Sequence, residues 1–163
     1  MNSDSNPYPS IQICSLEGAR EIDHSMYDGV ITIENSNTDD PLRIDESICP
    51  QLVLCFDDIA TPEGEWILPK ERHVRTALEF ADELRGSSLL IHCHAGISRS
   101  SGIALAIIAK GLGPGKEKQA FKELEKINPN CQPNALLVWF VDDILEREGS
   151  LFKMAKSMVR LTG

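Results

Sequence analysis

Four short apolar runs alternate along the chain with longer segments whose apolar residues recur every three or four positions. The runs at 11–14, 29–33, 52–56 and 88–92 are rich in Ile, Val and Leu and predict β-strands. The periodic segments at 15–22, 71–85, 99–110, 116–127 and 134–147 predict helices, three of which end at a Gly or at an Asn-Pro turn.

Strands that alternate with helices favour an α/β fold, with one central, mostly parallel sheet of about four to five strands flanked by helices. In such a sheet, a ligand is expected beyond the carboxyl ends of the strands. We expect one domain over 11–149, preceded by a flexible segment over 1–10. Residues 150–163 form a basic amphipathic tail. We expect a last helix that packs on the domain or frays in solvent, and the alternative is a helix that docks on a surface or a partner.

The 163-residue chain is acidic, with a formal net charge of −9. This charge argues against nucleic acid and anionic membrane surfaces as partners, but a local field can still hold a phosphorylated ligand. No run approaches the ~18 apolar residues of a membrane span, and the polar N-terminus lacks a signal-peptide pattern. The five cysteines form no Cys-x-x-Cys pair, so we expect no metal site and a reducing, cytoplasmic location.

The segment from Ile91 to Gly102 reads Ile-His-Cys-His-Ala-Gly-Ile-Ser-Arg-Ser-Ser-Gly and joins a predicted strand to a predicted helix. A tight turn of backbone N–H groups before a helix N-terminus suits a phosphate. Gly96 permits the turn, and Arg99 offers a planar pair of donors to phosphate oxygens. The same surroundings favour the thiolate of Cys93, which can attack phosphorus and form a covalent thiophosphate. The sequence therefore predicts a phosphate cradle with a nucleophile at its base.

The other residues of this turn are given binding and supporting roles. We expect phosphate or sulfate to bind in the loop. Its oxygens would accept from the guanidinium of Arg99 and from the backbone N–H groups of His94, Ala95, Gly96, Ile97, Ser98 and Arg99. Ser100 is placed to donate a hydrogen bond to the thiolate, and His92 to fix the loop from behind.

Release of an alcohol or a phenol from phosphorus needs a proton donor on a loop that can approach the cradle. Asp57 and Asp58 follow a predicted central strand, at the sheet edge where the Cys93 loop also lies. Either carboxyl suits the role by position, and a pair of acids that only closes a turn is the alternative.

The pattern His-Cys-x-x-Gly-x-x-Arg-Ser-x-Gly in this setting resembles the signature loop of the protein tyrosine phosphatase superfamily, in its dual-specificity-like branch. The segment 54–59 resembles the acid loop of small bacterial members, and this resemblance maps their acid onto Asp58, with Asp57 as the alternative. Glu71-Arg72-His73-Val74 and Pro133-Asn134 extend the resemblance over about 11–145. The glutamine that positions water in the family has only Gln132 as a candidate here.

This resemblance implies a cysteine-dependent phosphomonoester hydrolase of the protein tyrosine or dual-specificity type, with a phosphocysteine intermediate and no metal or organic cofactor. The expected substrate is a phosphorylated protein or a small phosphomonoester. A phosphate-binding adaptor without turnover and a rhodanese-like sulfur transferase stay open as alternatives. The cysteines at 14, 49, 55 and 131 are expected to be inert, and the alternative is that one of them lies near Cys93 and forms a protective disulfide with it.

Overall fold

The computed structural model describes residues 7–84 and 86–162, with the side chains of 159–162 left aside. Four strands form one parallel sheet in the order β1-β4-β2-β3. They are β1 (Ser10–Cys14), β2 (Gly29–Glu34), β3 (Gln51–Cys55) and β4 (Ser88–His92). All four were predicted to within one residue at each end, and the parallel α/β sheet is confirmed.

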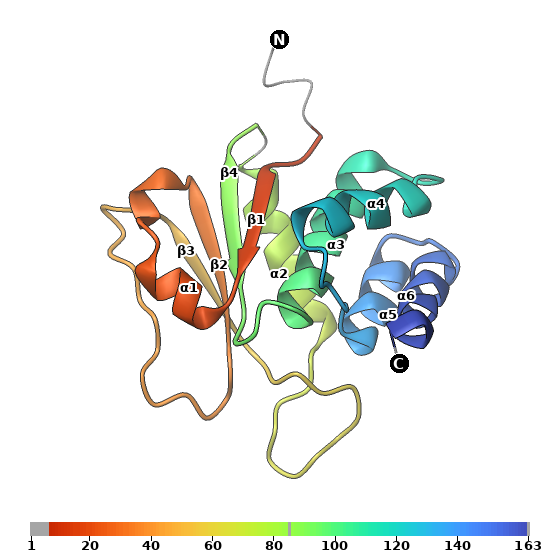
Figure 1. Ribbon diagram of the computed structural model, residues 1–163, viewed down its shortest axis with the longest axis horizontal. Coiled ribbons are helices and arrows are strands. Elements are labelled where there is room, and N and C mark those ends of the chain that lie inside the picture. The colour runs from red at the N-terminus through yellow and green to blue at the C-terminus, as the bar shows by residue number, and fades with distance from the viewer. Residues whose placement is uncertain (1–6, 85, 163) are drawn as a thin grey trace.

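Helices cover the two faces of the sheet unequally. Figure 1 shows α1 (Leu16–Glu21) on one side of the sheet and the later helices gathered on the other. A short 3-10 helix, η2 (His24–Met26), follows α1. The later helices are α2 (Glu71–Asp82), α3 (Arg99–Leu112), α4 (Glu117–Ile127), α5 (Ala135–Ile144) and α6 (Ser150–Thr162).

The larger core lies between the sheet and the helices α2 to α6. Its fully buried side chains include Ile31, Ile33, Leu89, Ile91 and Ile103. A smaller core under α1 holds Val30, Cys49 and Leu90. Helix α3 is buried along most of its length, from Arg99 to Ala109, because it runs between the sheet and the other helices. This burial fixes the helix N-terminus, at which the Cys93 loop ends.

Three predicted helix ends are wrong. Helix α3 continues past the expected end at Lys110, and Gly111 does not end it. A Cβ at Gly111 would lie 2.7 Å from the Pro7 carbonyl oxygen, so this glycine permits close packing against Pro7. The helix ends only at Gly113, whose φ of 91° is left-handed. Helix α5 ends at Ile144 instead of Arg147, since the Arg147 side chain is buried and donates to the Ala109 carbonyl at the end of α3. Helix α2 also ends earlier than expected, at Asp82.

The two ends of the chain are described in part. Ser10 already belongs to β1, whereas 1–6 of the expected flexible segment lie outside the described residues. The tail forms α6, which packs on α5 and buries Leu151 and Ala155, while Gly163 lies outside the description. In the part of the chain described, we find no helix with the length and apolar character needed to cross a membrane.

Candidate active site

The loop between β4 and α3 makes a tight turn at the carboxyl edge of the sheet. Gly96 has a left-handed φ of 75°, and a Cβ at this position would lie 2.7 Å from the carbonyl carbon of Cys14. The Leu16 N–H donates to the His94 carbonyl at 3.0 Å, which ties the loop to the start of α1. The turn therefore requires the glycine that the sequence provides.

Cys93 lies at the base of this turn and is only 2% exposed. The Gly96 N–H donates to its Sγ at 3.3 Å, and the Ser100 Oγ lies 3.2 Å from the same sulfur. Ser100 was expected to donate to the thiolate, whereas the Gly96 N–H was not predicted as a partner of the sulfur; both groups can donate to a thiolate. The amino end of α3 adds the positive end of a helix dipole at the same place.

Arg99 reaches across the loop from the first turn of α3 and is 4% exposed. One guanidinium nitrogen, Nη1, donates to the Phe56 carbonyl at 2.8 Å, and the Phe56 ring stacks on His73 at 4.5 Å. The Nε of Arg99 is buried and has no hydrogen-bond partner within 7–84 and 86–162. A buried guanidinium N–H without an acceptor is costly, so this group suits an anion in the loop.

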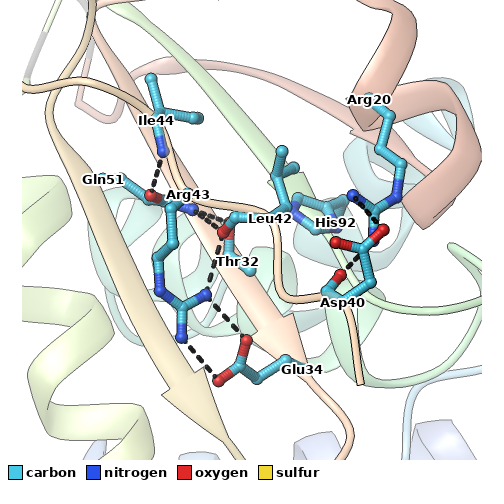
Figure 2. A network of polar contacts seen from close by, with 9 residues as sticks. All are labelled: Arg20, Thr32, Glu34, Asp40, Leu42, Arg43, Ile44, Gln51 and His92. Atoms are coloured by element: carbon cyan, nitrogen blue, oxygen red, sulfur yellow. Dashed lines mark hydrogen bonds and ion pairs between the residues drawn. The ribbon is translucent and has the colours of Figure 1, made fainter. Parts of the chain in front are cut away.

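A chain of hydrogen bonds supports the loop from behind, and Figure 2 shows its part from Gln51 through Thr32 to His92. The Gln51 Nε2 donates to the Thr32 Oγ1 at 2.8 Å, and this hydroxyl lies 2.8 Å from the His92 Nε2. The His92 Nδ1 lies 3.3 Å from the Cys93 carbonyl, so the consistent tautomer carries its proton on Nδ1. Three strands thus contribute one side chain each to fix the residue before the cysteine.

The same view shows how charged groups frame this chain of hydrogen bonds. Arg43 donates to both carboxylate oxygens of Glu34, and Arg20 donates to the Asp40 carbonyl. Burial lowers the pKa of His92 to about 4, so the ring stays neutral near pH 7. His92 therefore fixes the loop by hydrogen bonding and adds no positive charge to it.

The two adjacent carboxyls have different surroundings. Asp57 is 4% exposed, and its carboxylate accepts hydrogen bonds from the N–H and Oγ of Ser36 and from the Ile67 N–H. Burial alone would raise the pKa of Asp57, but these hydrogen bonds and the charge of Arg99 hold it below its usual value. Asp57 consequently joins the loop after β2 to the loop after β3.

Asp58 is exposed and faces the end of the Cys93 loop. The Ser98 hydroxyl donates to its Oδ1 at 2.7 Å, and the Asn134 Nδ2 donates to the same oxygen at 2.9 Å. This carboxyl is therefore held beside the cradle by one residue of the loop and one residue of the segment before α5.

The segment 128–134 supports the loop. The sequence had indicated a role at the site only for Gln132 of this segment, as the candidate water-positioning glutamine. Asn128 donates to the Gly96 carbonyl at 2.7 Å, and the backbone N–H of Asn134 donates to the Ser98 carbonyl at 3.2 Å. The Asn134 side chain also caps α5, with its Oδ1 accepting from the Leu137 N–H. The Pro133-Asn134 pair was the available signal. Gln132 lies against the loop through its backbone N–H, with an exposed side chain.

The remaining loop side chains, those of His94, Ala95 and Ile97, are exposed at the mouth of the site. A pocket of about 190 Å³ adjoins the loop, with Cys93 and His94 on one wall and the segment 34–42 on the other. Burial raises the pKa of Cys14 and of Cys131 to about 11, which keeps both thiols protonated. Within the described residues, no three His, Cys, Asp or Glu side chains gather into a metal-binding group.

Comparison with known proteins identifies the fold. No protein-family model matches the chain. Human dual specificity protein phosphatase 8 is 37% identical over 81 residues, which make up 48% of this chain but only 12% of that protein.

Among solved structures, human DUSP28 aligns with a TM-score of 0.63 at 15% identity, over 86% of this chain and 94% of that one. A human tyrosine phosphatase-like serine/threonine/tyrosine-interacting protein aligns with a TM-score of 0.57 at 24% identity, over 73% and 76% of the two chains. The chain therefore has the fold of the dual-specificity phosphatases, and the resemblance inferred from the signature loop is confirmed.

Proposed function

We propose that this chain, built on the dual-specificity phosphatase fold, is a cysteine-dependent phosphatase that hydrolyses phosphomonoesters. One observation carries the proposal. The Cys93 sulfur is buried between the Gly96 N–H and the Ser100 hydroxyl, and at the end of the same turn the buried Nε of Arg99 has no hydrogen-bond partner in the described part of the chain. A nucleophile and an anion-binding group thereby share one small, rigid loop.

In the proposed reaction, the Cys93 thiolate attacks phosphorus while backbone N–H groups of 94–99 and the Arg99 guanidinium hold the phosphoryl oxygens. The bond from phosphorus to the leaving oxygen breaks, and Asp58 gives that oxygen its proton. The product of this half-reaction is a free alcohol or phenol and a thiophosphate on Cys93. Asp58, now a carboxylate, then takes a proton from water, which attacks phosphorus and releases inorganic phosphate and the thiolate.

Of the two carboxyls, we assign the acid to Asp58. Its exposed carboxyl stands beside Ser98 at the mouth of the loop, whereas three hydrogen bonds occupy the buried carboxylate of Asp57. The lowered pKa of Asp57 also favours the ionised form, which cannot donate a proton. We infer that Asp57 shapes the loop and that Asp58 carries out the proton transfer.

The proposed substrates are a phosphorylated protein or a small phosphomonoester. The mouth of the site, where the side chains of His94, Ala95 and Ile97 are exposed, gives a phosphate on a protein chain direct access to the turn. The fold similarity to dual-specificity phosphatases gives the adaptor and sulfur-transferase alternatives no support.

Hydrolysis of para-nitrophenyl phosphate in the presence of a metal chelator tests the proposal. We expect turnover by the native protein and none by Cys93→Ser, which should still bind vanadate or phosphate because the backbone donors remain. Cys49→Ser is the matched control, since Cys49 is equally buried but lies in the small core under α1. A folded Cys93→Ser protein that still turns over would falsify the mechanism. Thiocyanate formation from thiosulfate and cyanide would favour the sulfur transferase instead.

A further inference from the structure

A second recess lies between the segment that follows Asp58 and the helices α5 and α6. On one side of Trp139 it has a volume of about 280 Å³, and its wall includes Ala60, two residues after Asp58, and Leu136 in the first turn of α5. On the other side of Trp139 a hollow of about 380 Å³ is lined by acidic residues. We call the two hollows together the Trp139 groove.

An exposed aromatic residue divides this groove. Trp139 is 56% exposed, and its ring meets the edge of Phe152 at 5.4 Å with an interplanar angle of 83°. The Lys156 ammonium lies 5.1 Å from the Phe152 ring on the α6 side. A tryptophan that stands between two hollows and is held by a second ring has the character of a binding hot spot.

Three carboxylates beside Trp139 form no ion pair with the side chains that the structure describes. Asp143, Glu146 and Glu148 are exposed, and among the described side chains none of these carboxylates has a hydrogen bond or an ion pair. Their neighbour Asp142 differs, because it is buried and accepts from the backbone N–H groups of Gly149 and Leu151 at the start of α6. Asp142 therefore holds the turn between the helices, and the other three carboxylates are available to a ligand.

The acidic part of the groove is held in a fixed shape. Glu146 and Glu148 both have a left-handed φ of 55°, which non-glycine residues rarely adopt. Arg147, between them, is buried and donates to Glu117 at 2.9 Å and to the Ala109 carbonyl at 2.8 Å. This anchor turns the two carboxylates outward before any ligand arrives, which lowers the entropic cost of binding one.

We propose that the Trp139 groove docks a segment of the phosphoprotein substrate that carries apolar and basic side chains. An apolar side chain fits the hollow beside Ala60 and Leu136, and Arg or Lys fits between the Trp139 ring and the free carboxylates. A second copy of this chain is a poor occupant, because each copy carries a net charge of −9. The proposal rests on the proposed phosphatase activity, since the segment that follows Asp58 forms one wall of the groove.

The test compares a small substrate with two phosphotyrosine peptides. One peptide carries leucine and arginine on both sides of the phosphotyrosine, and its twin has glutamine in place of each arginine. The groove variants are Trp139→Ala and Glu146→Gln/Glu148→Gln. The matched controls are Met26→Ala, 73% exposed on η2, and Glu46→Gln/Glu79→Gln, which removes two exposed carboxylates elsewhere.

We expect the groove variants to raise KM for the arginine peptide about tenfold, as loss of a binding hot spot does. Their kinetics with para-nitrophenyl phosphate should stay native, and the native preference for the arginine peptide over its twin should disappear. Equal KM values for the groove variants and the controls would overturn the docking site. Self-association that Trp139→Ala abolishes, measured by sedimentation, would assign the groove to a second copy and also overturn the proposal.

Calorimetry with the unphosphorylated arginine peptide separates this proposal from the phosphatase activity. Binding that needs Trp139, in a protein that turns over no phosphate ester, would overturn the proposed function and the assignment of the bound segment as substrate. Turnover of para-nitrophenyl phosphate without any groove-dependent peptide binding would leave the proposed function intact and overturn the groove alone.

Discussion

Single side chains divide the work of the proposed site between support and chemistry. Asp57 and Asp58 are neighbours in sequence and identical in type, yet one is buried with three donors and the other is exposed beside Ser98. The sequence could not separate them, because the donors to Asp57 come from Ser36 and Ile67, which are 21 and 10 residues away. Only the folded arrangement of the two loops shows that Asp57 is buried and that Asp58 is exposed.

Replacement of each aspartate by asparagine should have distinct effects. Asp58→Asn removes the proposed proton donor. The pH profile of para-nitrophenyl phosphate turnover should then no longer decline at high pH, and turnover should fall by about 10²-fold or more. Asp57→Asn should mainly lower the free energy of unfolding, by about 1–3 kcal/mol, because an amide N–H₂ cannot accept from Ser36 and Ile67. Kinetic pH profiles and urea unfolding of both variants measure these effects.

The pH dependence of the Asp57 effect follows from its lowered pKa. The stabilisation is present above the unfolded value of 3.8 and is lost as the pH falls below it. The stability difference between native protein and Asp57→Asn should therefore shrink in acid. A difference that grows in acid would contradict the assignment of Asp57 as an ionised support.

Among the helices, α3 and α5 do most to position the site. Helix α3 presents its amino end to the Cys93 loop, and the residue that caps α5, Asn134, reaches both Asp58 and the Ile59 carbonyl. The apolar periodicity predicted both helices, since it depends on local spacing. It could not show that the cap of α5 touches the acid loop, because 76 residues separate Asn134 from Asp58.

Two substitutions at Asn134 can separate the cap from the contact with Asp58. Asn134→Ser keeps an oxygen that can accept from the Leu137 N–H but loses the N–H₂ donor to Asp58, so stability should change little. Turnover of phenyl phosphate, whose leaving group needs a proton, should fall more than turnover of para-nitrophenyl phosphate. Asn134→Ala should show the same kinetic selectivity and also cost about 1 kcal/mol of stability. Equal losses on both substrates would argue against a positioning role.

The molecule as a whole buries two neutral histidines, His73 in α2 and His92 at the end of β4. Burial lowers the pKa of His73 and of His92 to about 4, from an ordinary value of 6.5. The His73 Nδ1 accepts from the Lys70 N–H, and its buried Nε2 has no partner in the described part of the chain. Because both rings take up a proton only on unfolding, their stabilisation is full above 6.5 and declines toward pH 4.

The free energy of unfolding should therefore fall steeply between about pH 6.5 and pH 5, a range in which carboxylates titrate little. Each buried histidine adds a slope of up to about 1.4 kcal/mol per pH unit. His73→Phe keeps a ring against Phe56 and removes one titrating group. The free energy of unfolding of this variant should therefore fall less steeply with decreasing pH, as expected for the loss of roughly one proton taken up on unfolding. Urea unfolding at several pH values measures both slopes, and equal slopes would show that His73 is not buried as a neutral ring.

The parallel sheet, its four strands and the Cys93 loop could all be predicted because they depend on local patterns of apolar residues and on one dense motif. The ends of α3 and α5 could not, since the roles of Gly111 and Arg147 depend on contacts with Pro7 and Ala109, which are far away in sequence. The same holds for the Trp139 groove, whose walls come from three separate segments.

The carboxylate of Asp57 also limits how the mouth of the site can open. It accepts hydrogen bonds from Ser36 in the loop after β2 and from the Ile67 N–H near the end of the loop after β3. The Ile67 carbonyl in turn accepts from the Asp57 N–H. A swing of the whole acid loop would have to break bonds to a charged acceptor, at about 1.5–3 kcal/mol each, or carry the neighbouring loop along. The segment between Asp58 and Trp66 lies between these two anchored points, so a wider opening of the mouth would move both walls together.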